Sequence, residues 1–476
     1  MSSRQIWIIA GVLVLIVFCI CSILALAIFG VQIFSREIVE NVPTASILPV
    51  FTEIAHETPV PTIGLGPTQT PSATPRPTSS VPIDPEVQAQ MVDIEAQVSQ
   101  LRGLHATSAL ARSLLSPAEL HEYVLNDFFD DYSPEEARDD ALVLSLLGLL
   151  EPGFDLLNFY TDLFSEQVAG FYDDEIKQMF VVQESGFGGL ERSTYAHEFV
   201  HALQDQIYNF DEGLDYNDDS CEIDTERCAA IQALVEGDAT ILQEEWLQTY
   251  ATQQDFIDLL EFFEVFQQPV FDSAPNYMQQ DFLFPYTYGA DFVREIRDRG
   301  GWSAVDAVYA DLPVTTEQIL HPDQYPWDKP VVLAPPNVVN ALGAGWREIE
   351  FNVLGEWFTH LVLVEYIDTD RSFEAAEGWG GDVYVAFAND AQNTGALLLI
   401  SQWDSIDDAH EAQSAFVEYG DMRYGVGSPV SDGWMWWSAE GYAQYEYSGN
   451  QTLLIFAPDE DLLNALRSAI QFPLVN

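Results

Sequence analysis

The stretch "STYAHEFVHALQDQ", Ser193 to Gln206, carries the residues whose types and spacing most clearly predict chemistry. His197, Glu198 and His201 form the pattern H-E-x-x-H. In an α-helix, positions four apart lie on one face about one turn apart, so both imidazoles can bind a single ion. The pattern is short, but two of only eight histidines stand here around a glutamate. We therefore expect a helix from about Ser193 that supplies two metal ligands; the alternative is two histidines without such a role.

A catalytic zinc site needs three protein ligands and one open position. Glu236, in "LVEGDA", is the best third ligand, because a carboxylate in the apolar helical stretch Ala229–Leu242 is costly unless it is paired or binds a metal. The alternative is a solvated position on a half-exposed helix. Gly237 would let this helix approach the histidine helix closely. Asp238 lies about 200° round the helix from Glu236, so we expect it to support or cap rather than to bind the metal.

Other residues could supply the remaining functions of a hydrolytic site. Glu198 follows a ligand directly and points beside the ion, where a general base can take a proton from the attacking water and deliver it to the leaving amine. Asp205, four residues past His201, could orient a ligand imidazole, although a surface acid is the commoner case. His321 and Tyr288 are candidates to stabilise the oxyanion, although structural roles are commoner for both.

These motifs also carry a family resemblance. "AHEFVHALQDQ" followed by "ALVEGDAT" resembles the zincin metallopeptidases, in particular the gluzincin-like group. The wider run from about Glu166 to Tyr325 is similar to a largely uncharacterised family of bacterial membrane-anchored metallopeptidases. The resemblance implies zinc bound by His197, His201 and Glu236. It also implies that Glu198 is catalytic.

The chain departs from thermolysin-like members of that group in two ways. Glu236 follows His201 by 35 residues, a longer interval, and Thr240 stands four residues after Glu236, where an acidic residue is usual. In zincins a strand beside the zinc helix binds extended peptide, and we predict that Ile176–Val182 is that edge strand.

The overall charge limits the classes of partner. The chain has 17 basic and 76 acidic residues, a formal net charge of -59. Such a field repels nucleic acid and anionic membrane surfaces, so neither is expected as a partner. A soluble acidic surface is the simplest explanation, and a preference for cationic peptides is a weaker one.

The N-terminal region predicts a membrane anchor. From Ile6 to Phe34, 29 residues contain no charge, more than the roughly 20 that a helix needs to cross a bilayer. No small-residue cleavage site follows a short apolar core, so an uncleaved anchor is expected rather than a signal peptide. Arg4 lies on one side, while Arg36 on the other is offset by two acids, which places the N-terminus in the cytoplasm.

The segment after this anchor predicts a location outside the cytoplasm. Residues 41–82 are rich in Pro, Thr and Ser and should form an extended disordered stalk. Cys19 and Cys21 fall inside the anchor, whereas Cys221 and Cys228 form a C-x6-C pair. An oxidising exterior would permit a disulfide between the last two, and two free thiols are an equal alternative.

The predicted fold class is α+β, with a transmembrane helix at the N-terminus. Residues 1–40 are the anchor with its flanks, 41–82 the stalk, 83–330 a mainly helical zincin-like domain with a small β-hairpin, and 331–476 a C-terminal helix with an α+β module. Ser116 and Ser133, each followed by proline and then by glutamate at the third helical position, predict two helix starts.

The C-terminal module shows a strand-strand-helix pattern twice. We expect one four-stranded antiparallel sheet with both helices on one face. Before it, "WREIEFNVLGEWFTHLVLVEYI" predicts an amphipathic helix.

The sequence thus predicts a zinc-dependent peptidase, anchored by one transmembrane helix outside a bacterial cytoplasmic membrane, that hydrolyses a peptide or protein near that surface. One alternative keeps the zinc but makes the anchored domain a catalytically inactive binding or interaction module. A more distant alternative is an acidic scaffold with incidental histidines.

Overall fold

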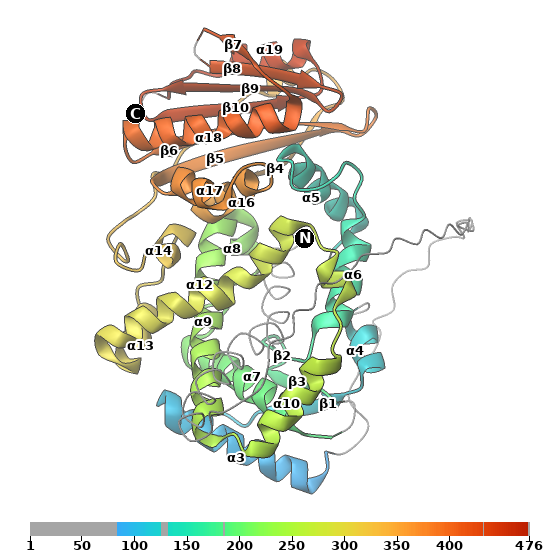
Figure 1. Cartoon of the computed structure of the whole chain (residues 1–476), viewed down its shortest axis with the longest axis vertical. Helices are drawn as coiled ribbons and strands as arrows, with labels where there is room; N and C mark the ends of the chain where they lie inside the picture. Colours follow the sequence, from blue (N-terminus) through green and yellow to red (C-terminus); the bar gives the residue numbers. More distant parts are fainter. Residues whose placement is uncertain (1–82, 125–131, 184–185, 432, 475–476) are drawn as a thin grey trace, which may run out of the picture.

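The computed structural model describes residues 83–124, 132–183, 186–431 and 433–474. A helical body with a small three-stranded sheet lies below a larger C-terminal sheet in the view of Figure 1. The helices of the body are α3 (Pro85–Arg102), α4 (Pro117–Tyr123), α5 (Pro134–Leu146), α6 (Leu156–Gln167), α7 (Gly189–Tyr208), α8 (Asp218–Ile223), α9 (Thr225–Tyr250), α10 (Gln253–Val265), α11 (Pro269–Asp272), α12 (Asn276–Gly300), α13 (Trp302–Val308) and α14 (Thr316–Leu320).

The starts of α4 and α5 follow the predicted chemistry. Ser116 and Ser133 accept hydrogen bonds from the backbone N–H groups of Glu119 and Glu136, and both glutamates bond back to complete capping boxes. These two sequence predictions are confirmed. The capping residues satisfy N–H groups that a helix leaves unpaired at its start.

The helices that carry the predicted ligands form the centre of the body. α7 begins at Gly189, four residues before the predicted start, and α9 begins at Thr225. α9 is buried on all sides from Cys228 to Gln243 because α3, α7, α12 and α14 pack around it. At its start, Cys228 forms a disulfide with Cys221 of α8.

The close approach at Gly237 involves a different helix from the one predicted. A Cβ atom at Gly237 would clash with the carbonyl of Gly289 on α12, and one at Gly289 would clash with the carbonyl of Ala233 on α9. The expected partner, α7, is not what requires this glycine. The two glycines instead let the backbones of α9 and α12 touch.

The small sheet consists of β1 (Ala111–Leu115), β2 (Gly170–Asp173) and β3 (Gln178–Val182) in the order β1-β3-β2. The predicted hairpin is confirmed, since β2 and β3 pair antiparallel across the acidic turn after Asp173. The predicted edge strand is wrong, because β1 pairs parallel with the far side of β3 and makes β3 the central strand. The edge strand of the hairpin is therefore β2, which packs against α7.

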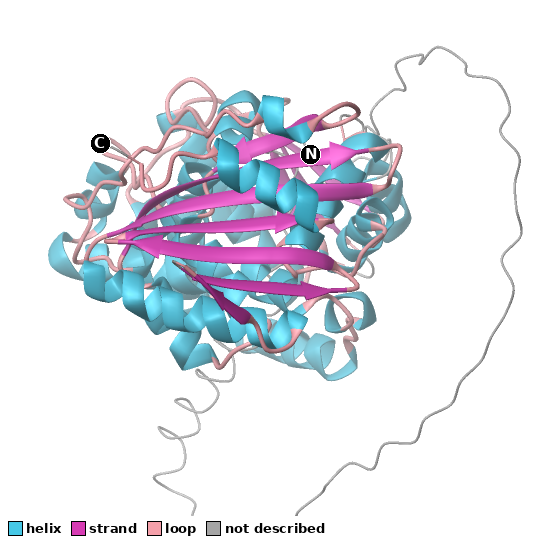
Figure 2. Ribbon diagram, turned by 90° about the horizontal axis from the view of Figure 1, so that it is seen from above, coloured by secondary structure: helices cyan, strands magenta, loops and turns pink. Residues whose placement is uncertain are grey.

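The C-terminal part adds α15 (Val339–Leu342), β4 (Arg347–Asn352), α16 (Gly355–Val364), α17 (Thr369–Ala376), β5 (Trp379–Asn389), β6 (Thr394–Trp403), α18 (Ile406–Tyr424), β7 (Ser428–Val430), β8 (Gly433–Ser438), β9 (Gly441–Ser448), β10 (Gln451–Ala457) and α19 (Glu460–Ala469). Its strands form one antiparallel sheet in the order β4-β5-β6-β10-β9-β8-β7, seen from above in Figure 2.

This sheet corrects the predicted fold class in two respects. It has seven strands rather than four, and its two helices cover opposite faces (Figure 1). Leu397 and Leu399 pack in the same core as α18, whereas Leu398 and Ile400 pack in the core under α19. Alternate residues of a strand point to opposite faces, so the continuous apolar run of β6 is buried on both sides.

The sequence predicts a single helix from Trp346 to Ile367, and this prediction is wrong for the first half of the segment. Residues 347–352 form β4, which pairs with β5, and the helix α16 begins only at Gly355. β4 is an edge strand of the sheet, and of its residues only Asn352 is buried, while Phe351 is exposed.

The predicted transmembrane helix is not supported by this structure. Within the ranges that the structure describes, no helix is both long enough and apolar enough to cross a bilayer. The segment Ile6–Phe34, the stalk at 41–82, and Cys19 and Cys21 lie outside the described residues.

The crossing of α9 and α12 generates a stability prediction. Gly237→Ala should lower the free energy of unfolding by about 1–3 kcal/mol, because the added methyl group forces the two backbones apart. Gln248→Ala, at an exposed position of the same helix, should change it by less than about 0.5 kcal/mol. Urea unfolding of the full chain measures both, and equal effects would show that the glycine contact is not required.

Candidate metal centre

α7 and α9 bring three ligand atoms together. The Nε2 atoms of His197 and His201, one turn apart on α7, lie 3.2 and 3.3 Å from Oε2 of Glu236 on α9. The two imidazole rings stand edge to face with their centroids 4.7 Å apart. The exposed fractions of the three residues are 0%, 8% and 6%. The structure thus assembles all three predicted ligands in one buried cluster.

The spacing of these atoms suits a zinc ion. In a tetrahedral site with bonds of about 2.0–2.1 Å, neighbouring ligand atoms lie about 3.3 Å apart. Both distances from Oε2 of Glu236 match that separation. Two imidazoles and a carboxylate are also a donor set of catalytic zinc sites, in which the fourth position stays open.

The three ligands influence one another electrostatically. Burial opposes charge on each of them, but the two imidazoles lower the pKa of Glu236 below its ordinary value. Its carboxylate in turn raises the pKa of His201, against the effect of burial. Burial lowers the pKa of His197, which favours the neutral imidazole that a metal requires. Glu236 is therefore held as an anion beside the two imidazoles.

Glu198 lies beside this cluster, where the sequence placed a general base. Its carboxylate is 2% exposed and accepts a hydrogen bond from the backbone N–H of Tyr172 in β2. Burial raises the pKa of Glu198 to about 8, and the charge of Glu236 adds to this effect while His201 opposes it. The hydrogen bond ties the carboxylate to the edge strand of the small sheet.

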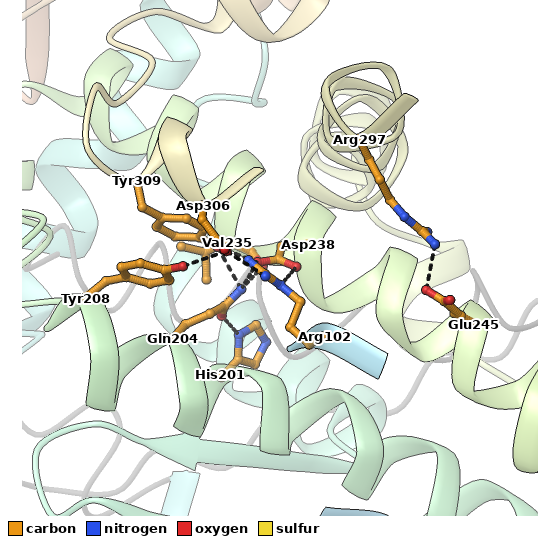
Figure 3. Close-up of polar contacts among 10 residues, drawn as sticks. All are labelled: Arg102, His201, Gln204, Tyr208, Val235, Asp238, Glu245, Arg297, Asp306 and Tyr309. Atoms are coloured by element: carbon orange, nitrogen blue, oxygen red, sulfur yellow. Dashed lines mark hydrogen bonds and ion pairs between the residues drawn. The ribbon is translucent and has the colours of Figure 1, made fainter. Parts of the chain in front are cut away.

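Gln204, which the sequence analysis missed, orients one ligand. Nδ1 of His201 lies 2.9 Å from Oε1 of Gln204 (Figure 3). The amide nitrogen of Gln204 donates to the carbonyl of Val235 and contacts the hydroxyl of Tyr309, both at 2.9 Å, which directs its oxygen toward the imidazole. That oxygen can only accept, so the proton of His201 is favoured on Nδ1 and Nε2 is left free to bind a metal.

A buried ion pair lies behind Gln204. Arg102 of α3 donates to Asp238 of α9 over 2.8 Å, and both side chains are fully buried. The hydroxyl of Tyr309 donates to the same carboxylate at 2.9 Å, and Arg102 also pairs with Asp306 at 2.7 Å (Figure 3). Asp238 therefore supports the ligands through Gln204 and does not point at the metal position. No local sequence pattern connects it with Arg102, which lies 136 positions away.

Asp205 does not orient an imidazole, contrary to the sequence hypothesis. Its carboxylate accepts hydrogen bonds from the hydroxyl of Tyr172 at 2.8 Å and from Nζ of Lys177 at 2.7 Å. It also accepts the backbone N–H of Phe210 just past the end of α7. Through these hydrogen bonds, Asp205 connects the β2–β3 hairpin to α7.

The structure places neither predicted oxyanion-stabilising residue among the ligands. Nε2 of His321 pairs with Oε1 of Glu356 on α16 at 2.9 Å. The ring of Tyr288 packs against Trp357 and Phe373. The described contacts of both residues therefore face the C-terminal part of the chain.

Tyr286, two positions before Tyr288 on α12, lies beside the candidate ligands, where a donor could stabilise an oxyanion. It is buried, its ring stacks on His197 with centroids 6.3 Å apart, and its hydroxyl hydrogen-bonds Glu236. Burial and the charges of Glu236 and Glu198 raise its pKa well above the ordinary value, so the hydroxyl stays a donor. Gly289, three residues further on the same face of the helix, contacts α9, but this contact is visible only in the structure.

Comparison with known proteins adds little to this site. A family model described as a domain of unknown function, DUF8575, matches residues 344–467. The matched segment runs from just before β4 into α19 and does not include the three ligands. Neither curated proteins nor solved structures give a match.

The contact between His201 and Gln204 generates a test of ligand orientation. Gln204→Ala should weaken metal affinity by about 10- to 100-fold, because His201 loses the acceptor that fixes its tautomer. Gln206→Ala, on the same helix but bonded to the loop at residues 107 and 108, should keep the affinity of the parent chain. Competition with a chromophoric zinc chelator measures both. Equal metal affinities of the parent chain and both variants would show that Gln204 does not orient His201.

Proposed function

We propose that this protein is a zinc-dependent peptidase. The observation that carries the proposal is the convergence of two imidazole nitrogens and one carboxylate oxygen at tetrahedral spacing, with a second buried carboxylate, Glu198, beside them. A structural zinc site would be closed by a fourth protein ligand, whereas the described residues offer three.

Each residue of the site has a definite task in this proposal. His197, His201 and Glu236 would hold the ion, which when bound supplies a Lewis acid that polarises a carbonyl and acidifies water. Glu198 would take the proton of the attacking water and pass it to the leaving amine. Tyr286, a buried donor beside Glu236, would stabilise the negative charge that develops on the carbonyl oxygen.

The surroundings of the site suit a peptide substrate. β2 is an edge strand of the small sheet, and the backbone N–H of its Tyr172 donates a hydrogen bond to the carboxylate of Glu198. An extended peptide that paired with this edge would run past the base and the ligands. The disulfide between Cys221 and Cys228 supports a location in an oxidising compartment outside the cytoplasm.

Metal analysis of the full chain tests the first half of the proposal. The purified protein should contain about one zinc per chain, since the described ligands form one His-His-Glu cluster. His201→Ala and Glu236→Ala should each lose it. Plasma mass spectrometry that also counts iron, nickel and copper identifies the ion, and a chain that cannot be loaded with zinc would overturn the proposal.

Glu198→Gln tests the second half, because the amide keeps the size of the side chain but cannot accept the proton. The variant should retain zinc and cleave a quenched fluorescent peptide library about 10²- to 10⁴-fold more slowly than the parent chain. Glu212→Gln, in an exposed loop, is the matched control and should cleave normally. If the parent chain holds zinc but cleaves no peptide, the alternative of a catalytically inactive binding module is favoured.

Tyr286→Phe and Tyr288→Phe separate the structural assignment from the sequence hypothesis. Removal of the Tyr286 hydroxyl should lower kcat by about 100-fold with zinc content unchanged, as expected for a donor that acts in the transition state. Tyr288→Phe should leave kcat within about twofold, because its ring has a packing role. If Tyr288→Phe lowers kcat more than Tyr286→Phe does, Tyr288 and not Tyr286 stabilises the oxyanion.

A further inference from the structure

A second group of carboxylates lies between the helical body and the C-terminal sheet. Glu317 of α14, Asp328 of the following loop and Asp404 just after β6 bring carboxylate oxygens within 4.8 Å of one another. They are separated widely in sequence, so the fold itself creates the cluster. It shares no residue with the zinc ligands.

The buried carboxylate of this cluster, Glu317, has no hydrogen-bonding or ionic partner among the described residues. Glu317 is only 3% exposed, yet no hydrogen bond or ion pair involves its side chain within the described part of the chain. Nor does any described basic residue form an ion pair with Asp328 or Asp404. A buried carboxylate is normally hydrogen-bonded, paired with a cation or bound to a metal.

The surroundings add more negative charge. Oε1 of Glu356 hydrogen-bonds His321, but its buried Oε2 has no hydrogen-bond partner in the part of the chain that the structure describes. Burial, and then the charges of Glu356, Asp328 and Asp404, raise the pKa of Glu317 to about 9. Glu317 therefore requires either a proton or a bound cation at neutral pH.

We propose that Glu317, Asp328 and Asp404 bind a calcium ion that ties the helical body to the C-terminal sheet. An oxygen-only donor set selects a hard cation. Three carboxylates from separate segments suit the flexible coordination of Ca²⁺ better than the near-ideal octahedron that Mg²⁺ demands, and the exposed Asp404 leaves room for water ligands.

The position of this site gives it a structural consequence. Next to Glu317, the N–H and hydroxyl of Thr316 donate to the carboxylate of Glu226, which belongs to the first turn of α9. Asp404 directly follows β6 of the sheet, and its backbone N–H donates to the carbonyl of Gly378, just before β5. A cation held between Glu317 and Asp404 therefore links the helix of the third zinc ligand to the C-terminal sheet.

Terbium luminescence of the full chain tests the proposal, because Tb³⁺ occupies calcium sites and is sensitised by nearby tryptophan. Trp327 and Trp403 stand next to Asp328 and Asp404 in the chain. Tb³⁺ should give sensitised emission that Ca²⁺ displaces and Mg²⁺ does not. Asp404→Asn and Asp328→Asn should each weaken the competing Ca²⁺ by about tenfold or more, since ligand charge sets calcium affinity.

Two control variants make the outcome decisive. Asp323→Asn, an exposed acid of the same loop outside the cluster, should bind Ca²⁺ like the parent chain. His201→Ala should also bind Ca²⁺ normally, so that failure of the zinc site and failure of this one are distinguishable. Emission that Ca²⁺ does not displace, or that all three Asp→Asn variants retain equally, would overturn the calcium site and leave Glu317 as a protonated acid.

Discussion

The contact of one oxygen of Glu236 with the Nε2 atoms of both histidines depends on how closely α9 lies against α7. A carboxylate in that buried position is stable only while both imidazoles stay within reach, because an isolated buried anion is strongly disfavoured. The surrounding elements act on this one crossing. α12 lies against α9 at Gly237 and Gly289, and Asp205 of α7 accepts hydrogen bonds from the β2–β3 hairpin.

The hydrogen-bond network behind His201 connects the crossing of α7 and α9 to α3, the first helix of the described chain. Arg102 of α3 reaches Asp238 in a fully buried ion pair, and Asp238 shares the hydroxyl of Tyr309 with Gln204. Removal of one partner of such a pair typically costs about 3–5 kcal/mol, because the other charge is left buried. α3 is thus part of the support of the candidate metal centre.

The three candidate ligands were predictable because the pattern that indicates them is local. His197 and His201 are four residues apart on a helix, and Glu236 stands in an apolar stretch where an acid requires a partner. Gln204 and Tyr286 were missed because their roles depend on which helix face meets α9, a matter of tertiary packing. His321 and Tyr288 were chosen by residue type alone, and the structure directs both toward the C-terminal part.

In the fold too, features with local signals were predicted and features that depend on long-range packing were missed. Serine-proline caps and the acidic hairpin turn are local signals, and they were predicted correctly. The partners of a strand are not local, so β1 beside β3 and the extra strands β4, β7 and β8 were missed. The apolar runs of β5 and β6 did contain a usable signal, because a strand with one solvated face alternates and these do not. That signal predicts helices on both faces of the sheet.

The account rests most on the claim that His197, His201 and Glu236 bind one zinc ion with an open fourth position. X-ray absorption at the zinc edge of the purified full chain tests it directly. The predicted first shell contains two imidazole nitrogens and two oxygens at about 2.0–2.2 Å. A shell that contains sulfur, six oxygens or no histidine nitrogen would contradict the proposed centre.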